Sequence, residues 1–450
     1  MVKSLELENK WKLITKYHDA GLDPLRWLPV CSNEIKLDQL QILFGQLKRN
    51  NLRFGPSYYS YFHHPEKKNV EIIRRIYRIN EEIKPEDLKT KKALSIFKWD
   101  KKIVCNNDLV IQKIKKVSEQ LKAKIELEKV LMIPTNTRED YQFTLFDHIK
   151  IPRGNITGYS IATNSSTQVT DIGQDIDSSI HMEIALTESI NLLNLLGCSN
   201  DVNLFPIYDA PTEEILDKIR KDIDRFTVKY NYCFEDYSSL KLNGLFFATT
   251  ATGNSHKEIP NKYDLVDENM QIVCTDKFGL LACFCLCIIT TISEKLSEKL
   301  YNYGISENRL KELKELAIKN LTEPKISLGK IIAKFLPEFE NKFDFNSHII
   351  VTHPISKNGI NGLYELSKLI NKEVIIDDIP SIDQDVTNFI SNEYLVSDNT
   401  ASTSNTNIII ISKDLSSILL DELSKNKFEP KIIGKIGKSG SSRVIFNNKK

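Results

Sequence analysis

The stretch that decides the fold is YSIATNSSTQVTDIGQDIDSSIHMEIALTESINLLNLLG (159–197). Its beginning, together with the preceding glycine, is a β-prone run that predicts a strand at 158–163. Its second half predicts a helix at 178–197, because serines can cap the start, apolar residues recur on one side and Gly197 suits the C′ position. The loop between these two elements is crowded with aspartates.

The sequence that follows this stretch alternates between helix and strand patterns. Helical spacing of apolar residues and capping residues predict helices at 209–226, from Ser306 to about 321, at 363–370 and at 414–423. Short β-branched runs predict strands at 243–253, 271–275, 348–352, 373–377, 407–412 and 431–437. A Ser/Thr/Asn-rich run at 397–407 predicts an exposed loop. Alternating elements of this kind predict an α/β or α+β fold.

The part before residue 130 differs in composition and pattern. It is basic, and it carries apolar residues at helical spacing in 69–83 and 109–125. A chain of 450 residues is long enough for two or three domains. We therefore predict a basic, mainly helical N-terminal region at 1–130, a first domain at 131–300 and a second domain at 301–450.

Composition favours a soluble globular protein. Lys and Arg number 61 against 60 Asp and Glu, and 41% of the residues are hydrophobic. The longest apolar run, 280–289, is far shorter than the ~20 residues that a membrane span requires. The first residues have no apolar signal-peptide core. We expect a cytoplasmic protein with no membrane contact.

The eight cysteines form no CxxC pair. Cys283, Cys285 and Cys287 alternate within one apolar run, and we interpret them as small apolar residues in a buried segment, with a redox or metal role as the alternative. Cys31 and Cys105 are the N-terminal cysteines. Lysines beside Cys105 could lower its pKa, and the reactivity of both thiols is left open.

The order of these pieces resembles the selenophosphate synthetase and aminoimidazole ribonucleotide (AIR) synthetase superfamily of ATP-using proteins, over about two-thirds of the chain. The stretch at 159–197 resembles its first-domain signature. HIIVTHPISKNGINGLYELSKLINKEVIIDDIPSI (348–382) resembles its glycine-rich turn and Ile-Pro segment, and 407–437 resembles its terminal strand–helix–strand. The resemblance implies an α/β (α+β), AIR-synthetase-like two-domain architecture with an additional N-terminal region. It also implies a homodimer, with ATP and Mg²⁺ bound in a cleft beside the acidic loops of the first domain.

The resemblance also assigns a site. Phosphoryl transfer requires carboxylates that hold Mg²⁺ near the triphosphate. By position in the family pattern, the candidate metal ligands are Glu139, Asp140, Asp171, Asp175 and Asp177, and the candidate nucleotide contacts are Thr163, Asn164, Gly359 and Gly362. The alternatives are solvated loop carboxylates beside Arg138 and, for Asp177, capping of the helix that begins at 178.

Several positions depart from the family pattern. Asn164 stands where an aspartate is expected, and His353 stands where the second domain should carry another. A histidine cannot replace a carboxylate for Mg²⁺, and we interpret His353 as a partly buried histidine with satisfied hydrogen bonds. The segment 233–244 replaces a Gly-Gly loop, and a glycine-rich loop with Cys and Lys is missing.

Two main functions remain open. The first is ATP-dependent phosphoryl transfer of the selenophosphate-synthetase type, with selenide or another small acceptor. The alternative is a non-catalytic nucleotide- or protein-binding homologue that has lost the magnesium-site carboxylates. An RNA partner rests on the basic charge of 1–130 alone. The aromatic and basic run at 53–69 could stack nucleobases, but we favour a domain contact.

Overall fold

The computed structural model describes most of the chain from residue 174 onward and shorter pieces before it. The described residues are 12–13, 15–17, 19–20, 34–36, 53–54, 126–128, 131–134, 140–144, 148–152, 158–167, 174–236, 238, 244–292, 294–355, 360–394 and 406–447. The predicted helices at 69–83 and 109–125 lie outside this set, as do Cys31, Cys105 and all but two residues of the loop at 397–407.

The first sheet has seven strands in the order β2-β3-β6-β7-β10-β8-β9. The strands are β2 (Arg53–Phe54), β3 (Glu126–Glu128), β6 (His148–Pro152), β7 (Tyr159–Thr167), β8 (Asn200–Asp209), β9 (Cys233–Phe234) and β10 (Phe246–Ser255). A separate sheet has the order β1-β5-β4, with β1 (Glu34–Lys36), β4 (Leu131–Pro134) and β5 (Asp140–Thr144). Strand β10 pairs antiparallel with both β7 and β8, so these three long strands are neighbours in the larger sheet.

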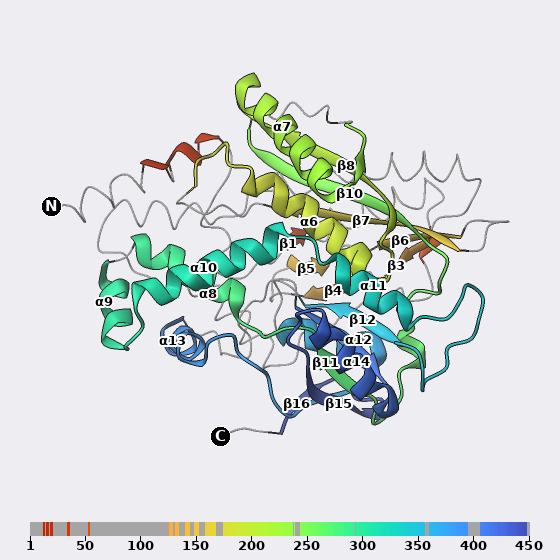
Figure 1. The fold of residues 1–450 in the computed structure, drawn as a ribbon. Coiled ribbons are helices and arrows are strands. Elements are labelled where there is room, and N and C mark those ends of the chain that lie inside the picture. The colour runs from red at the N-terminus through yellow and green to blue at the C-terminus, as the bar shows by residue number, and fades with distance from the viewer. Residues whose placement is uncertain are drawn as a thin grey trace.

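Two helices, α6 (Ile180–Leu195) and α7 (Glu213–Tyr230), pack on one face of this sheet (Figure 1). The strand residues beneath them include Leu204 and Ala251, which are cross-strand partners and therefore point to the same side. Side chains of both helices join these residues in one buried core. The alternation of the strands thus decides which face the helices cover.

The ends of these elements refine the predicted boundaries. Gly197 adopts φ +71 just after α6, which confirms its predicted C′ role. Helix α7 begins four residues later than predicted, because β8 extends to Asp209 and the side chain of Thr212 caps the helix by accepting the N–H of Ile215. Strand β7 is longer than predicted and continues to Thr167.

The second sheet has six strands in the order β12-β14-β11-β15-β13-β16. The strands are β11 (Gln271–Cys274), β12 (Val351–Pro354), β13 (Lys372–Ile376), β14 (Asn407–Ile411), β15 (Lys431–Ser439) and β16 (Val444–Phe446). Although β11 precedes residue 300, it pairs with β14 and β15 inside this sheet. The predicted domain boundary at residue 300 stays a prediction. By sheet membership, the change from the first sheet to the second occurs between β10 and β11.

Helices cover both faces of the second sheet. Helix α12 (Ile360–Ile370) packs on one face, and α11 (Ile326–Lys334) and α14 (Lys413–Lys425) pack on the other. Ile408 and Ile410 of β14 face α12, whereas Ile409 and Ile411 face the opposite helices. Strand β14 is therefore a continuous isoleucine run, as expected for a strand that is buried on both sides.

The remaining helices form a group beside the second sheet (Figure 1). They are α8 (Leu280–Ile292), α9 (Glu294–Asn302), α10 (Glu307–Thr322) and α13 (Gln384–Tyr394), and a short 3₁₀ helix, η1 (Tyr263–Leu265), precedes β11. Ser306 caps α10 by accepting the N–H of Arg309, as predicted. Cys283 and Cys287 of α8 are buried, which confirms their interpretation as apolar core residues. No helix within the described residues combines the length and apolar character that crossing a bilayer requires.

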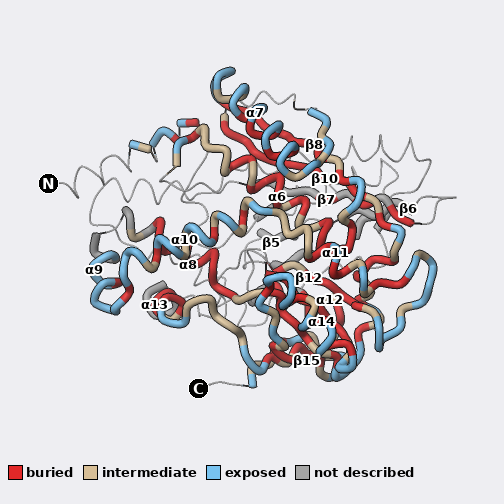
Figure 2. Tube along the Cα trace, viewed as in Figure 1, coloured by how far each residue is buried: buried red, intermediate tan, exposed pale blue. Residues whose placement is uncertain are grey.

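Helix α6 connects the two sheets and is buried along most of its length (Figure 2). It contacts β7 and β10 on one side and α10, α11 and β12 on the other. The side chain of Asn191 accepts the N–H of Lys325 at 2.7 Å, and the hydroxyl of Thr352 donates to the carbonyl of Leu195 at 2.7 Å. These observations confirm the predicted mixed α/β architecture.

We expect Gly329→Ala to destabilise the protein. A Cβ at Gly329 would lie 2.7 Å from Asn194 Oδ1 and 3.1 Å from Asn194 Cα, so α11 would have to move away from α6. Overpacking of this kind costs about 1–3 kcal/mol and outweighs the higher helix propensity of alanine. Thermal unfolding measures the effect. The exposed neighbour Lys330 gives the control, since Lys330→Ala should leave the melting temperature almost unchanged. Equal stability of both variants would contradict this close contact.

Candidate functional site

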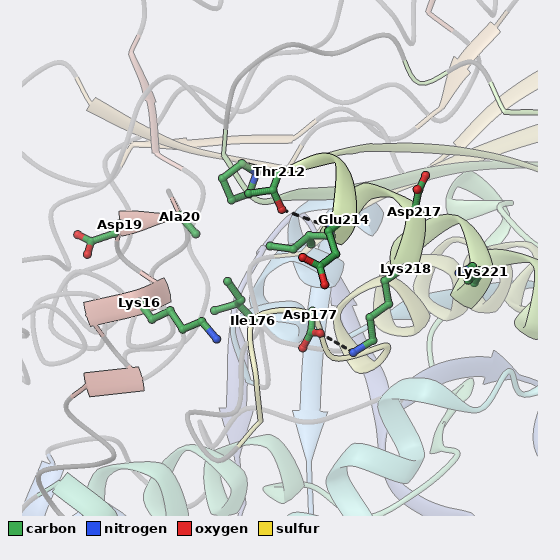
Figure 3. Close-up of a pocket in the computed structure, with 12 residues that line it drawn as sticks. Lys16, Asp19, Ala20, Ile176, Asp177, Thr212, Glu214, Asp217, Lys218 and Lys221 are labelled. Carbon is green, nitrogen blue, oxygen red and sulfur yellow. Dashed lines mark hydrogen bonds and ion pairs between the residues drawn. The ribbon is translucent and has the colours of Figure 1, made fainter.

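A pocket of about 800 Å³ lies between the N-terminal segment 16–20, the loop before α6 and the first turns of α7 (Figure 3). Ile176 and Asp177 of the loop form part of its wall, and Thr212 marks the beginning of α7. This volume is within the range of pockets that hold small molecules and cofactors.

Charged groups dominate the pocket wall. Its lysines are Lys16, Lys218 and Lys221, and its carboxylates are Asp19, Asp177, Glu214 and Asp217. Because the acidic groups outnumber the lysines, an anionic ligand such as a polyphosphate would not be neutralised by the wall alone. A bound divalent cation would supply the missing positive charge.

Asp175 and Asp177 are the two predicted metal ligands whose side chains the structure describes. Lys16 Nζ lies 2.6 Å from Asp175 Oδ1, and Lys218 Nζ lies 2.6 Å from Asp177 Oδ2. The two lysines approach the loop from opposite sides (Figure 3). Lys16, helped by the N–H of Ile176, holds the pKa of the Asp175 carboxyl below its ordinary value. The N-cap residue of α6 is Ser179, and each of the two carboxylates is paired with a lysine.

These ion pairs can exchange with a ligand at low cost. The side chain of Asp175 is 57% exposed and that of Asp177 is 36% exposed, so water screens both pairs. Exposed pairs contribute about 0–1 kcal/mol. A phosphate could therefore take up the lysines while a cation takes up the carboxylates.

The other candidate metal ligands are placed only in part. Glu139 and Asp171 lie outside the described residues. Asp140 belongs to β5, where its backbone position lies opposite Lys36 of β1 in the three-stranded sheet. Within the described part of the chain, no group of three His, Cys, Asp or Glu residues is arranged to hold a metal ion. The five-residue magnesium set therefore stays a prediction.

The candidate nucleotide contacts lie in regular secondary structure. Thr163 was predicted as the last residue of a strand, but it lies inside the longer β7, is buried, and donates its hydroxyl to the carbonyl of Ser189 at 2.6 Å. Asn164 is the next residue of β7 and pairs with Thr250 of β10. Thr163 therefore faces the core under α6, and a phosphate could reach its hydroxyl only if this hydrogen bond were broken.

Of the two glycines in the predicted glycine-rich turn, the structure describes only Gly362. Gly359 lies outside the described residues, whereas Gly362 lies within α12 and not in a turn. A Cβ at Gly362 would come within 2.4 Å of Ile355 Cγ2, so glycine here permits a close approach of α12 to the chain after β12. His353 is fully buried and its Nε2 lies 3.0 Å from the carbonyl oxygen of Gly362, which confirms a histidine with satisfied hydrogen bonds.

Asp276 is an unusual ionisable group that the sequence analysis did not select. It follows β11, and burial raises its pKa to about 6, although the nearby charge of Lys325 opposes this shift. Perturbed carboxyls of this kind are frequent at functional sites. The only signal in the sequence was a single aspartate at the end of an apolar strand, which is too common a pattern to identify it.

Comparisons with known proteins give likenesses of fold only. No protein-family model matches the chain, and no curated protein matches it. Thiamine-monophosphate kinase from Stenotrophomonas maltophilia K279a is 11% identical, with a TM-score of 0.46 over 65% of this chain and 86% of that chain. The Aquifex aeolicus thiamine monophosphate kinase is 10% identical, with a TM-score of 0.45 over 77% and 99% of the two chains. The hydrogenase maturation protein HypE, solved in complex with ATP, is 15% identical, with a TM-score of 0.43 over 65% and 82%.

We expect Thr163→Val to lower stability by about 1 kcal/mol, because the buried hydrogen bond from its hydroxyl to the carbonyl of Ser189 is lost. Thr249→Val is the matched control. Thr249 is buried on the same side of the sheet, and its hydroxyl has no partner among the described residues, so its loss should be neutral or stabilising. Urea unfolding measures both variants. If Thr163→Val were neutral, the hydroxyl of Thr163 would be available for another role.

The raised pKa of Asp276 predicts a pH dependence of stability. As the pH rises from about 4 to about 6, the unfolded chain releases this proton before the folded chain does, so the folded state loses stability, by roughly 3 kcal/mol at most. Asp276→Asn should flatten the melting temperature over this range. Asp264→Asn, at an exposed position, should leave the profile of the wild type unchanged. A profile that Asp276→Asn does not alter would disprove the shift.

Proposed function

We propose that this chain binds ATP with Mg²⁺ in the pocket between residues 16–20 and α7, and that it transfers a phosphoryl group to a small acceptor. The observation that supports this proposal is the placement of Asp177 between Lys16 and Lys218 in a pocket of nucleotide size. The sequence resemblance implies the same ligands. Selenide, or another small nucleophile, is the acceptor that the resemblance suggests.

The charges of the pocket suit a magnesium–nucleotide complex. The ammonium groups of Lys16 and Lys218 are donors for phosphate oxygens, and Lys221 adds a third positive charge from α7. Asp175 and Asp177 would hold the magnesium ion, which would neutralise charge that develops during phosphoryl transfer. In the free protein Lys16 is paired with Asp175, and Lys218 is paired with Asp177. On ligand binding, the lysines would contact phosphate oxygens and the carboxylates would contact the magnesium ion, in place of the ion pairs.

The second candidate function is a non-catalytic nucleotide-binding homologue. It is favoured by the pairing of both described carboxylates with lysines and by the burial of His353 in the core. Such a protein would bind ATP through its lysines and would release no phosphate. The two candidates share the pocket and differ in turnover, and a homodimer is part of both proposals.

We expect ATP with Mg²⁺ to raise the melting temperature of the wild type. A ligand at one hundred times its Kd stabilises by about 2.7 kcal/mol. The double variant Asp175→Asn/Asp177→Asn should abolish most of this gain, because the magnesium ion loses its carboxylates. The control is Asp377→Asn/Asp378→Asn, which removes the same number of carboxylates from the exposed end of β13 and should keep the full gain. No shift of the wild type at millimolar ATP would reject the pocket as a nucleotide site.

Release of phosphate separates the two candidate functions. A phosphotransferase should release phosphate from ATP in the presence of selenide or sulfide, and the variant Asp175→Asn/Asp177→Asn should lose this release. Binding of ATP without any release, in the wild type, would select the non-catalytic homologue.

A further inference from the structure

The N-terminal segment 12–20 is folded against the first domain. Its described residues are helical up to Asp19, and Leu13, Tyr17 and Ala20 fall on one side at helical spacing. This side joins the core under α6 and α7, and Tyr17 is fully buried. The carbonyl of Ala20 accepts the N–H of Leu245, which ties the segment to the start of β10. Lys16, on the other side, reaches the pocket.

The hydroxyl of Tyr17 contacts the loop that carries Asp175 and Asp177. Its oxygen lies 2.6 Å from the carbonyl oxygen of Gln174 and 2.8 Å from that of Asp175. It has one proton, so it can donate to only one of these two carbonyls at a time. Both carbonyls belong to the loop before α6, and that of Asp175 also accepts the N–H of Ser178 at 3.0 Å.

His181, in the first turn of α6, completes this cluster. Its Nε2 lies 3.2 Å from the Tyr17 oxygen and 3.3 Å from the carbonyl oxygen of Asp175. With a proton on Nε2, the imidazole can donate to one of these oxygens while Tyr17 donates to Gln174. The two rings meet edge to face, with centroids 5.7 Å apart. Tyr17 and His181 thus hold the loop from two elements that are far apart in the sequence.

We propose that Tyr17 is a positioning residue of the nucleotide site, which fixes the loop 174–179 so that Asp175 and Asp177 present their carboxylates to the magnesium–nucleotide complex. This inference rests on the proposed function. The N-terminal segment is then a part of the site, since it supplies Lys16 to the pocket and the tyrosine that holds the loop. The first domain alone would carry an incomplete site.

The physical reason lies in the burial of the hydroxyl. Phenylalanine at position 17 would keep the ring in the core but remove the donor to the carbonyls of Gln174 and Asp175. The loop would then sample positions in which its carboxylates no longer meet the cation. Loss of an outer-shell partner commonly weakens a metal site by about 10–100-fold.

The test compares Tyr17→Phe with Tyr159→Phe in the full chain. Tyr159 is also a buried tyrosine of the first domain, and its hydroxyl donates to Glu258, away from the pocket. Each protein is measured for its Kd for ATP with Mg²⁺, for hydrogen exchange of the amides of 174–179, and for its melting temperature. We expect Tyr17→Phe to raise the Kd by about tenfold or more and to speed exchange in the loop. Tyr159→Phe should change neither.

Three results would overturn the inference. They are a Kd of Tyr17→Phe equal to that of the wild type, unchanged exchange in 174–179, and an equal loss of affinity in both variants, which would indicate general destabilisation. Absence of binding in the wild type would overturn the proposed function instead. In that case faster loop exchange in Tyr17→Phe alone would still support the positioning of the loop, and unchanged exchange would overturn it as well.

Discussion

The burial of helix α6 between two sheets is the constraint on which the rest of the structure depends. On one side α6 packs on β7 and β10, and on the other it meets α10, α11 and β12. Most residues of such a helix are buried, and hydrogen bonds across the interface satisfy some of its polar groups. Its carbonyls accept hydrogen bonds from Thr163 and Thr352, and Asn191 accepts the N–H of Lys325. These bonds fix both sheets relative to the same helix.

The same burial places the charged loop at the start of α6. A carboxylate could not enter the core without a large desolvation cost, so Asp175 and Asp177 remain outside it and meet lysines from two other elements. The loop itself is held from below by Tyr17 and His181, both of which are buried. The buried side chains of Tyr17 and His181 therefore lie on the core side of this loop. The carboxylates of the candidate site lie on its solvent side.

Several residues that the sequence resemblance selected serve the packing of the fold. Thr163 serves the packing of α6 on the sheet, and Gly362 allows α12 to approach Ile355. His353 is enclosed in the core of the second domain. Because function depends on the site and not on the fold, these residues carry little of the nucleotide proposal. The proposal depends on the lysines and carboxylates around the loop before α6.

The sequence by itself determined many of the strands and helices after residue 158, the cap at Ser306 and the stop at Gly197, since periodicity and capping are local properties. It did not predict β8, α8, α9 or α13. Through the family resemblance it also selected Asp175 and Asp177 as candidate metal ligands, which stay a prediction. Only the tertiary structure decided that Lys16 meets Asp175 across 159 positions of the chain, that Tyr17 reaches His181, and that β8 takes Asp209, the residue expected to begin α7. Contacts between distant residues leave no periodic pattern, because they arise from the way packed elements meet and not from the residues beside them.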